Sequence, residues 1–257
     1  MAQLVQVGFG SGLLYGTRTD IATATPRLLG IMQDVNLAFA GDAKELFGQY
    51  SYPMAVARGK TKITGKAKFA EINADIYNDF FFGQNVAGGG TATAFKESHT
   101  VPSATPYDFV VTNATEIPLA DLGCWNATTG SQYTLVTGTP TTAKTYAFDP
   151  TTGTYTFAAT EAGNNLVVDY TYTLPAATAP NRTITIANPF MGTTPFFKSV
   201  FTQTFQTKQT VLILNSCVAT SFSLPTRIDD FMISDLDFQA QADAAGVVGY
   251  LTTSIIP

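Results

Sequence analysis

The stretch that decides the fold reads Arg58-Gly-Lys-Thr-Lys-Ile-Thr-Gly-Lys-Ala-Lys-Phe69 and continues directly as Ala70-Glu-Ile-Asn-Ala-Asp-Ile-Tyr-Asn-Asp-Phe-Phe-Phe82. In its first part, the basic residues share one parity and the apolar residues share the other. Because side chains alternate between the two faces of a strand, this pattern predicts a strand with one basic and one apolar face. The basic set is Arg58, Lys60, Lys62, Lys66 and Lys68, and the apolar set is Ala57, Ile63, Ala67 and Phe69.

The second part of this stretch has the period of a helix. Phe69, Ile72, Ile76 and Phe80 recur at spacings of three and four, and Glu71, Asp75 and Asp79 form an acidic stripe on another face. Gly83 is placed to end the helix as its C-cap. The spacing therefore predicts an amphipathic helix over 70–82 that covers one open face of a sheet.

Alternation extends to both sides of this unit. Gln33–Phe39 has the period of a half-buried strand, and Gly41-Asp42 is expected to end it with a turn. Near the end of the chain, Asp235, Asp237 and Asp243 share one parity with two glutamines. The opposite parity holds Leu236, Phe238, Ala240 and Ala242, which we expect to pack inward. A strand here would therefore have an Asp/Gln face that meets water or another subunit.

The middle of the chain has a different composition. Residues 84–106, with three consecutive glycines and two prolines, favour a linker, and residues 99–192 contain 22 threonines but only eight charged residues. Within that region, Tyr146–Phe157 has the pattern of a hairpin, and Leu166–Tyr172 alternates as a strand. Short strands with regular turns predict a small β-sandwich inserted into the first domain.

The predicted fold class is thus mostly β: a first domain of strands with one α-helix over an open face of its sheet, plus an inserted small β-sandwich. The expected boundaries are 1–106 for the first part of the core, 107–190 for the Thr-rich insert, and 191–257 for the second part of the core. No helical stretch approaches the roughly 18 uninterrupted apolar residues of a membrane span. No leader is evident either, so we expect a cytoplasmic protein or one released by lysis.

Composition narrows the function. Of the 257 residues, 45% are hydrophobic and only 13% are charged, about half the usual charged share of roughly 25%. Low charge favours a surface that lies against other subunits, although a polar, uncharged surface fits equally well. The net charge of −5 argues against nucleic-acid binding as the main task. Cys124 and Cys217 are expected to be buried free thiols rather than a disulfide.

Catalysis is not expected. His99 is the only histidine and is predicted to be a solvated loop residue without an oriented partner. One histidine and two distant cysteines cannot compose a transition-metal site, and the Asp235 face lacks the glycine-turned loop of a calcium site. Gly8-Phe-Gly-Ser-Gly12 lacks the Lys and helix of a phosphate loop. We therefore expect no enzyme activity, no cofactor and no metal.

Four segments resemble the tail tube (major tail) proteins of long-tailed bacteriophages. They are Gly10–Asp20, Thr25–Val35, Gly59–Lys68 with the helix after it, and Ile228–Phe238. A fifth segment, Tyr155–Tyr172, is similar to a β segment found in several phage structural proteins. The resemblance implies a β-sandwich or barrel flanked by a helix, assembled as six-fold rings that stack into a hollow tube. It supplies no catalytic residues, and it departs from minimal tube proteins in the Thr-rich insert.

The function that this resemblance implies is a structural virion protein whose stacked hexameric rings form the conduit for genome ejection. Its partners would be copies of itself and other tail proteins, with double-stranded DNA as passing cargo and no membrane. It would assemble in the bacterial cytoplasm and reside in the phage tail. The alternatives are another virion component, such as a capsid decoration or minor tail protein, and a carbohydrate-binding adhesion module.

Two sets of charged residues receive roles as hypotheses. Arg58, Lys60, Lys62, Lys66 and Lys68 are expected at a subunit interface, in preference to a nucleic-acid or lumen-facing role. Asp235, Asp237 and Asp243 are expected to line the channel, where carboxylates repel phosphate over about one Debye length, ~8 Å at physiological ionic strength. Each phosphate neutralised by Lys or Arg would instead favour binding and hold the DNA.

Overall fold

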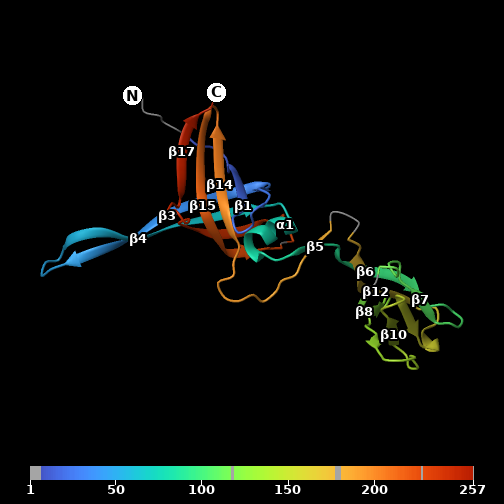
Figure 1. The fold of residues 1–257 in the computed structure, drawn as a ribbon. Coiled ribbons are helices and arrows are strands. Elements are labelled where there is room, and N and C mark those ends of the chain that lie inside the picture. Colours follow the sequence, from blue (N-terminus) through green and yellow to red (C-terminus); the bar gives the residue numbers. More distant parts are fainter. Residues whose placement is uncertain (1–6, 117–118, 177–180, 227, 257) are drawn as a thin grey trace. The chain divides into compact units, whose positions relative to one another are not determined.

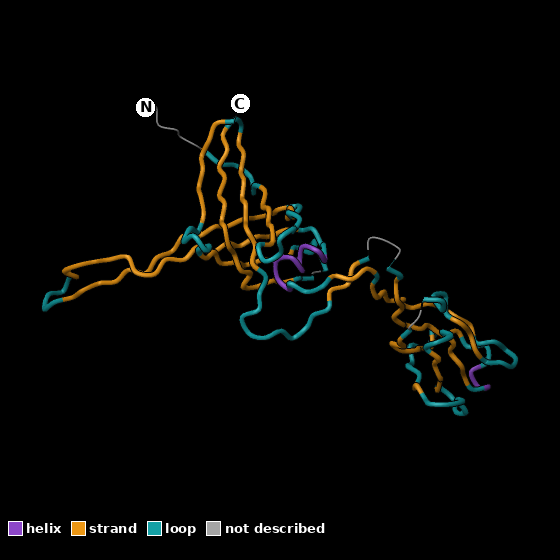
Figure 2. The backbone as a smooth tube through the Cα atoms, in the orientation of Figure 1, coloured by secondary structure: helices purple, strands orange, loops and turns teal. Residues whose placement is uncertain are grey.

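The structure is a computed structural model that describes residues 7–116, 119–176, 181–226 and 228–256. It is 54% strand and 5% helix, with several sheets and no closed barrel among the described residues, which confirms the mostly β prediction. The chain divides into two compact units: unit 1 is formed by residues 1–86 and 184–257, and unit 2 by residues 87–183. Figure 2 shows how much of the backbone is strand.

Unit 1 is built on one eight-stranded sheet with the order β2-β1-β14-β15-β16-β4-β3, in which β17 also pairs with β15 (Figure 1). Every pairing in this sheet is antiparallel. The strands are β1 (Leu13–Arg18), β2 (Arg27–Leu29), β3 (Met32–Phe47), β4 (Pro53–Phe69), β14 (Phe196–Phe205), β15 (Lys208–Ser223), β16 (Ser234–Gln241) and β17 (Gly249–Ile255).

The long strand β15 organises this sheet. Its first half pairs with β17 from Lys208↔Ile255 to Leu214↔Gly249, and its second half pairs with β16 from Ser216↔Gln241 to Ser223↔Asp235. One edge of β15 thus serves two different strands in succession, while β14 covers the other edge. The sheet therefore branches at β15.

The helical segment covers the core of this sheet, but it is shorter than predicted. The α-helix α1 spans Ala74–Tyr77 and continues as a π-helical turn, η1, over Asn78–Phe82. Asn73 has extended dihedrals and its side chain accepts a hydrogen bond from Asp75 N at 2.9 Å, so it caps the helix and keeps residues 70–73 out of it. Gly83 ends the segment in the left-handed region with φ of 64°, as predicted.

The predicted apolar face of this helix is correct at three of its four positions. Phe69, Ile76 and Phe80 are almost fully buried, whereas Ile72 is 62% exposed because it precedes the cap. Phe80 packs edge-on against Phe197, with ring centroids 5.0 Å apart. Gly16 in β1 makes room for it, because a Cβ there would lie 2.0 Å from a Phe80 ring carbon. The core of unit 1 consists of Leu14, Leu29, Ala67, Phe69, Ile76, Tyr77, Phe80, Phe197, Leu212, Leu214, Cys217, Leu236, Phe238 and Ala240.

Unit 2 is a β-sandwich of a four-stranded sheet, β7-β11-β10-β9, and a three-stranded sheet, β6-β12-β8. Its strands are β6 (Gly90–Thr100), β7 (Asp108–Val110), β8 (Ala120–Asn126), β9 (Thr134–Leu135), β10 (Thr145–Asp149), β11 (Thr154–Phe157) and β12 (Asn165–Leu174), and η2 (Ala159–Glu161) is one 3₁₀ turn. The predicted hairpin is present, with Tyr146 opposite Phe157. The core of unit 2 consists of Val101, Val111, Leu119, Cys124, Tyr133, Tyr146, Tyr155, Phe157, Leu166, Val168 and Tyr170.

The limits of the insert differ from the predicted 107–190. Unit 2 begins at Ala87, because β6 pairs with β12 along its whole length, from Gly90↔Leu174 to Thr100↔Asn165. Eleven of the 23 residues of the expected linker 84–106 therefore form a sheet strand. At the other end, the chain returns to unit 1 at Ile184 rather than after 190. The chain makes these passages in β5 (Val86–Gly88) and β13 (Arg182–Ile184), which pair with each other.

Candidate self-association surface

The most distinctive surface of unit 1 is a two-stranded arm formed by the outer halves of β3 and β4. The two strands pair from Met32↔Phe69 to Phe47↔Pro53 and are closed by the loop 48–52. Figure 1 shows the ribbon leaving the sheet, and Figure 2 shows both strands continuing to its tip. Side chains at the root of β4 are buried on alternate positions, whereas all residues from 40 to 52 and from 54 to 62 are exposed.

The arm has large apolar side chains on both of its strands and on its loop. Their exposed fractions run from 54% for Phe47 to 82% for Tyr52, and the set is Leu46, Phe47, Tyr50, Tyr52, Met54 and Val56. A two-stranded hairpin is marginally stable in water by itself, and it normally needs a third strand or a packed face. Since the described residues of this chain supply neither, the arm is suited to contact another molecule.

The arm was missed in the sequence, where Gly41-Asp42 was expected to end the first strand. The structure continues the strand through both residues to Phe47. Gly41 and Asp42 lie at a bulge instead of a turn, because β4 places Gly59 and Lys60 opposite Asp42 alone. The aromatic cluster Phe47-Gly-Gln-Tyr-Ser-Tyr52 followed by Pro53 was the signal that could have located the true turn.

The same bulge divides the predicted basic face. A methyl group on Gly41 would lie 3.1 Å from Thr61 Cγ2 and 3.2 Å from Arg58 Cδ, so Arg58 shares the face of Thr61. Lys60 lies in the bulge itself. Only Lys62, Lys66 and Lys68 keep the common face that parity predicted for all five residues, because one extra residue reverses the alternation beyond it.

The remaining basic residues and two of the acidic residues form one surface, which we call the polar face. In the register of the sheet, Lys68 lies between Asp34 and Asp235, and Lys66 lies between Asn36 and Asp237. Lys66 Nζ is 3.3 Å from Asp237 Oδ2. The two sets that the sequence assigned to different roles are therefore neighbours, and their charges alternate in sign across three strands.

The buried side of β16 is largely as predicted. Leu236, Phe238 and Ala240 are 2%, 1% and 8% exposed, whereas Ala242 lies beyond the end of the strand and is exposed. Phe238 fills the space over Gly65 in β4, where a Cβ would lie 2.1 Å from its ring. Alternation in β16 therefore orients Asp235 and Asp237 away from the core.

Asp243 does not belong to the polar face. It lies in the turn after β16 and accepts hydrogen bonds from Val247 N at 2.9 Å, Asn215 Nδ2 at 2.7 Å and Ala245 N at 3.0 Å. These bonds, above all the one from Val247 N, lower the pKa of its carboxyl group. Asp243 is thus a turn-forming residue, and it does not share the strand face of Asp235 and Asp237 that its parity predicted, because the strand ends at Gln241.

The acidic stripe of the helix also has a local role. Arg27 Nε donates to Asp79 Oδ2 at 2.9 Å, and its Nη2 lies 3.7 Å from Asp75 Oδ2. This joins β2 to the helical segment. These two carboxylates therefore stabilise the fold of unit 1.

Free strand edges are the other feature of unit 1 that suits association. Among the described strands, β2 and β3 are the outer ones of the sheet, and β17 pairs on one side only, with β15. Tyr250, Leu251 and Ile255 in β17 are 57%, 64% and 62% exposed. Exposed edge strands with apolar side chains are the usual template for pairing with another chain.

His99 and the two cysteines are held within the fold by packing and hydrogen bonds. His99 lies in β6, not in a loop: its ring stacks on Phe109 at 4.2 Å, and Nε2 is 2.6 Å from Glu97 Oε1. Within the described ranges, no group of three or more His, Cys, Asp or Glu side chains could hold a metal ion. Cys124 and Cys217 are free and buried, as predicted. None of the helices in the described part of the chain is long and apolar enough to span a membrane.

The chain matches no protein-family model and no curated protein sequence. The evidence on function therefore comes from the geometric features described above.

Proposed function

We propose that this chain is the structural subunit of a phage tail tube, in which six-fold rings of identical copies stack into a hollow conduit for DNA. The observation that carries the proposal is the β3–β4 arm. It is a paired ribbon with six exposed large apolar side chains and no packing partner among the described residues. Such a ribbon is marginally stable in water by itself, and a head-to-tail assembly can bury it in the next copy.

Two further observations support repeated self-association over a small-molecule function. The free edges of β2, β3 and β17 can extend the sheet across subunits, which would cover their unpaired backbone groups. The polar face alternates in sign instead of forming a basic patch. A tube that passes DNA must not bind phosphate, and lysines flanked by Asp34, Asp235 and Asp237 bind it less than a basic patch would.

The resemblance of the sequence to tail tube proteins specifies the kind of assembly. In the proposed virion, this chain would contact copies of itself and the other tail proteins, and double-stranded DNA would only pass through. It would act without catalysis, cofactor or membrane. The Thr-rich unit 2 would lie on the outside of the tube, because a domain of this size inside the channel would block it.

Truncation of the arm tests the proposal. Residues 44–57 would be replaced by Asn-Gly, which closes a two-residue turn between Ala43 and Arg58, a pair that is already in register. We expect the wild-type protein to form rings and tubes in electron micrographs at high concentration. The truncated protein should remain folded by circular dichroism and elute as a monomer in size-exclusion chromatography with light scattering.

A matched substitution separates the arm from exposed apolar area in general. Tyr50, Tyr52 and Met54 would be changed together to serine, and the control would change Val110, Leu122 and Leu135 of unit 2 to serine. Only the first triple variant should lose assembly. Tubes that form without the arm would contradict the proposal, and trimers or caps in place of tubes would favour a decoration or minor tail protein.

A further inference from the structure

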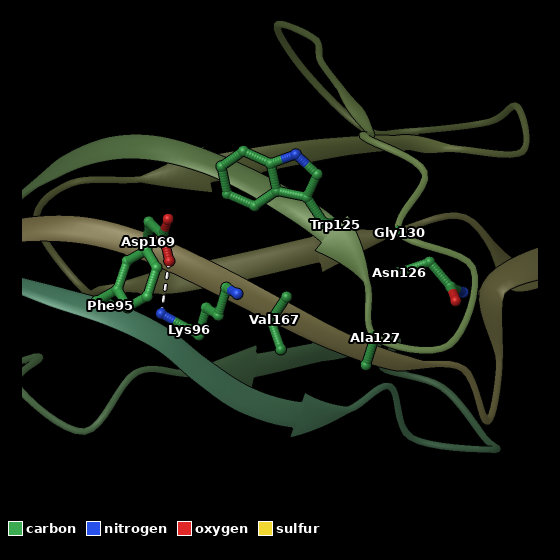
Figure 3. Close-up of a pocket in the computed structure, with 8 residues that line it drawn as sticks. All are labelled: Phe95, Lys96, Trp125, Asn126, Ala127, Gly130, Val167 and Asp169. Carbon is green, nitrogen blue, oxygen red and sulfur yellow. Dashed lines mark hydrogen bonds between the residues drawn. The ribbon is translucent and has the colours of Figure 1, made fainter.

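The outer face of the sheet β6-β12-β8 in unit 2 carries side chains that do not pack into its core. In β12, Leu166, Val168 and Tyr170 point into the sandwich and are fully buried. Val167 and Asp169 therefore point away from it, on the outer face of the sheet β6-β12-β8. A depression of about 450 Å³ lies on this face, and Figure 3 shows the residues that line it from all three strands.

The depression has an aromatic side chain on each flanking strand. Trp125 in β8 lies opposite Val167, and Phe95 in β6 is 72% exposed. The indole is held close to the backbone of Gly123, where a Cβ would lie 2.5 Å from Trp125 Cη2. Gly123 also has φ of 134°, which side chains rarely allow. The backbone is thus shaped to hold the Trp125 ring flat against the strand.

Polar groups are placed between these rings by two bulges at the same level. Opposite Asp169, β6 has Phe95 and Lys96, and β8 has the extra residue Leu122. Lys96 adopts φ of 52° and its backbone N–H donates to Asp169 Oδ1 at 2.6 Å, as the dashed line in Figure 3 shows. Bulges on both neighbours of one strand re-aim side chains and are frequent beside binding sites.

The loop that follows Trp125 forms one wall of the depression. The Asn126 side chain accepts from Thr128 N at 3.0 Å and Thr129 N at 2.9 Å, and Gly130 turns the chain back with φ of 68°. The wall is therefore fixed by hydrogen bonds before any ligand binds. Preformed sites lose less conformational entropy on binding.

We propose that this face of unit 2 binds a saccharide. The lining combines two aromatic rings with a carboxylate, an ammonium group and an amide: Trp125, Phe95, Asp169, Lys96 and Asn126. Sugar rings present C–H faces that pack on aromatic rings, and their hydroxyls both donate to carboxylates and accept from Lys or amide N–H groups. The volume is within the roughly 300–1,000 Å³ of small-ligand pockets.

A protein partner fits this face less well. A stable protein interface covers roughly 800 Å² on each partner and has an apolar centre. Among the described residues, unit 2 has only four exposed large apolar side chains, Phe95, Val110, Leu122 and Leu135. Val110 in β7 and Leu135 in β9 belong to the other sheet. The depression is therefore a local site and not part of a broad apolar patch.

The test uses the full-length protein and the fluorescence of Trp125, which is the only tryptophan in the chain and so reports on this site alone. The probes are maltotetraose, cellotetraose, chitotetraose and the methyl glycosides of galactose and mannose. We expect a saturable change in emission with at least one of them. Phe95→Ala and Asp169→Asn should each weaken that binding about tenfold, which is the loss of one aromatic or charged contact.

The control substitutions are Val110→Ala on the other sheet and Phe231→Ala in unit 1, both at exposed positions, and they should leave affinity unchanged. The proposal is overturned if no probe gives a saturable change, or if the signal persists in both Phe95→Ala and Asp169→Asn. Emission that changes only with protein concentration would show that a second copy covers this face, which also overturns the proposal. Each measurement is repeated on the arm-truncated protein, so that the result does not depend on tube assembly.

Discussion

The two units of this chain show opposite ways of treating apolar surface. Of the 27 large apolar side chains that are exposed among the described residues, 23 belong to unit 1 and four to unit 2. Unit 1 has its longest strands running past the core as the arm, whereas unit 2 closes two short sheets around its own core. Unit 1 therefore leaves a ribbon of large apolar side chains uncovered by its own described residues, whereas unit 2 buries most of its own.

Their cores also differ in polarity. Unit 2 anchors core tyrosines on carboxylates: Tyr133 and Asn164 donate to the buried Glu161, Tyr155 donates to Asp121 at 2.7 Å, and Tyr170 donates to Glu97 at 2.6 Å. In unit 1, the described core residues are apolar, and Ser199, Ser216, Ser234 and Asn78 are its buried polar residues. The cores share no residue. Each unit should therefore unfold as a separate transition with its own dependence on pH.

The largest expected effect concerns the two thiols, of which each unit has one. Burial, together with nearby Asp121 and Glu161, raises the pKa of Cys124 to about 12, and burial raises the pKa of Cys217 to about 12. At pH 8, the thiolate fraction should therefore be about 1,000-fold below that of an exposed cysteine with a pKa of about 9. We expect no reaction with Ellman's reagent in the folded protein and stepwise labelling during denaturation.

Mass spectrometry of the labelled protein identifies which thiol reacts at each step. Cys124 reports on unit 2 and Cys217 on unit 1. If both thiols become reactive at one denaturant concentration, the units unfold together and the comparison between them fails.

Glu161→Ala should destabilise unit 2 by about 3 kcal/mol, because it leaves buried donors without an acceptor. The donors are Tyr133 Oη, Asn164 Nδ2 and Lys144 N, and Glu161 itself is 3% exposed. Differential scanning calorimetry should show the transition of unit 2 lowered by roughly 10–20 °C, with that of unit 1 unchanged. Glu161→Gln keeps one acceptor oxygen and should lose less. Equal shifts of both transitions would show that the units are coupled.

A smaller effect is expected from acid. Burial alone would raise the pKa values of Glu97 and Glu161, but hydrogen bonds, led by those from Tyr170 and Tyr133 respectively, outweigh it and lower both. Because each folded pKa is below the unfolded value, the stability they contribute is present above about pH 4.5 and is lost as pH falls through the folded pKa. At pH values under about 4.5, the melting temperature of unit 2 should therefore decrease, and Glu161→Gln should reduce this decrease. A melting temperature independent of pH would contradict the assignment.

Short-range patterns in the sequence predicted the strands and the buried positions well. The alternation in β16 identified Leu236 and Phe238 as buried, because burial on one face acts on every second residue. In β12, the alternation predicted the strand, whose Leu166, Val168 and Tyr170 share the buried face. The Gly83 cap and the Tyr146–Phe157 hairpin follow from local backbone chemistry in the same way. Such features depend on a few adjacent residues and are therefore readable without the fold.

Features that depend on pairing between distant strands could not be predicted. The bulge at Gly59 and Lys60 reverses the parity of Arg58, and no residue type there requires it. The alignment of Asp237 with Lys66 brings together residues 171 positions apart. The sequence favours a linker at β6 because three glycines stand at its start and two prolines, Pro102 and Pro106, follow it. Register is set by the whole sheet, which a single segment does not encode.

The smallest expected effect concerns the charges of the polar face. Measuring it shows whether these charges mainly stabilise the fold or mainly stabilise the assembly. Lys66 and Asp237 form an exposed pair at 3.3 Å within one chain, and such pairs contribute about 0–1 kcal/mol to folding. Lys66→Asp places two carboxylates side by side in the row through Asp237, and a third only if a neighbouring copy contributes one. Its cost in the monomer should therefore stay within that range. In a ring, the same change is repeated in every copy and should weaken assembly more than folding.

The exchange variant Lys66→Asp with Asp237→Lys then separates the two roles. If the pair acts only within the chain, the exchange restores both the melting temperature of unit 1 and the assembly. If the polar face contacts a neighbouring copy, the exchange restores the melting temperature but not the assembly, because the position of each charge facing the neighbour is inverted. We expect the second outcome, measured by calorimetry and by sedimentation at two ionic strengths.

Since screening weakens exposed charge pairs, the difference in assembly should shrink at high salt. Assembly that is indifferent to both variants at low salt would show that the polar face makes no contact with a neighbouring copy.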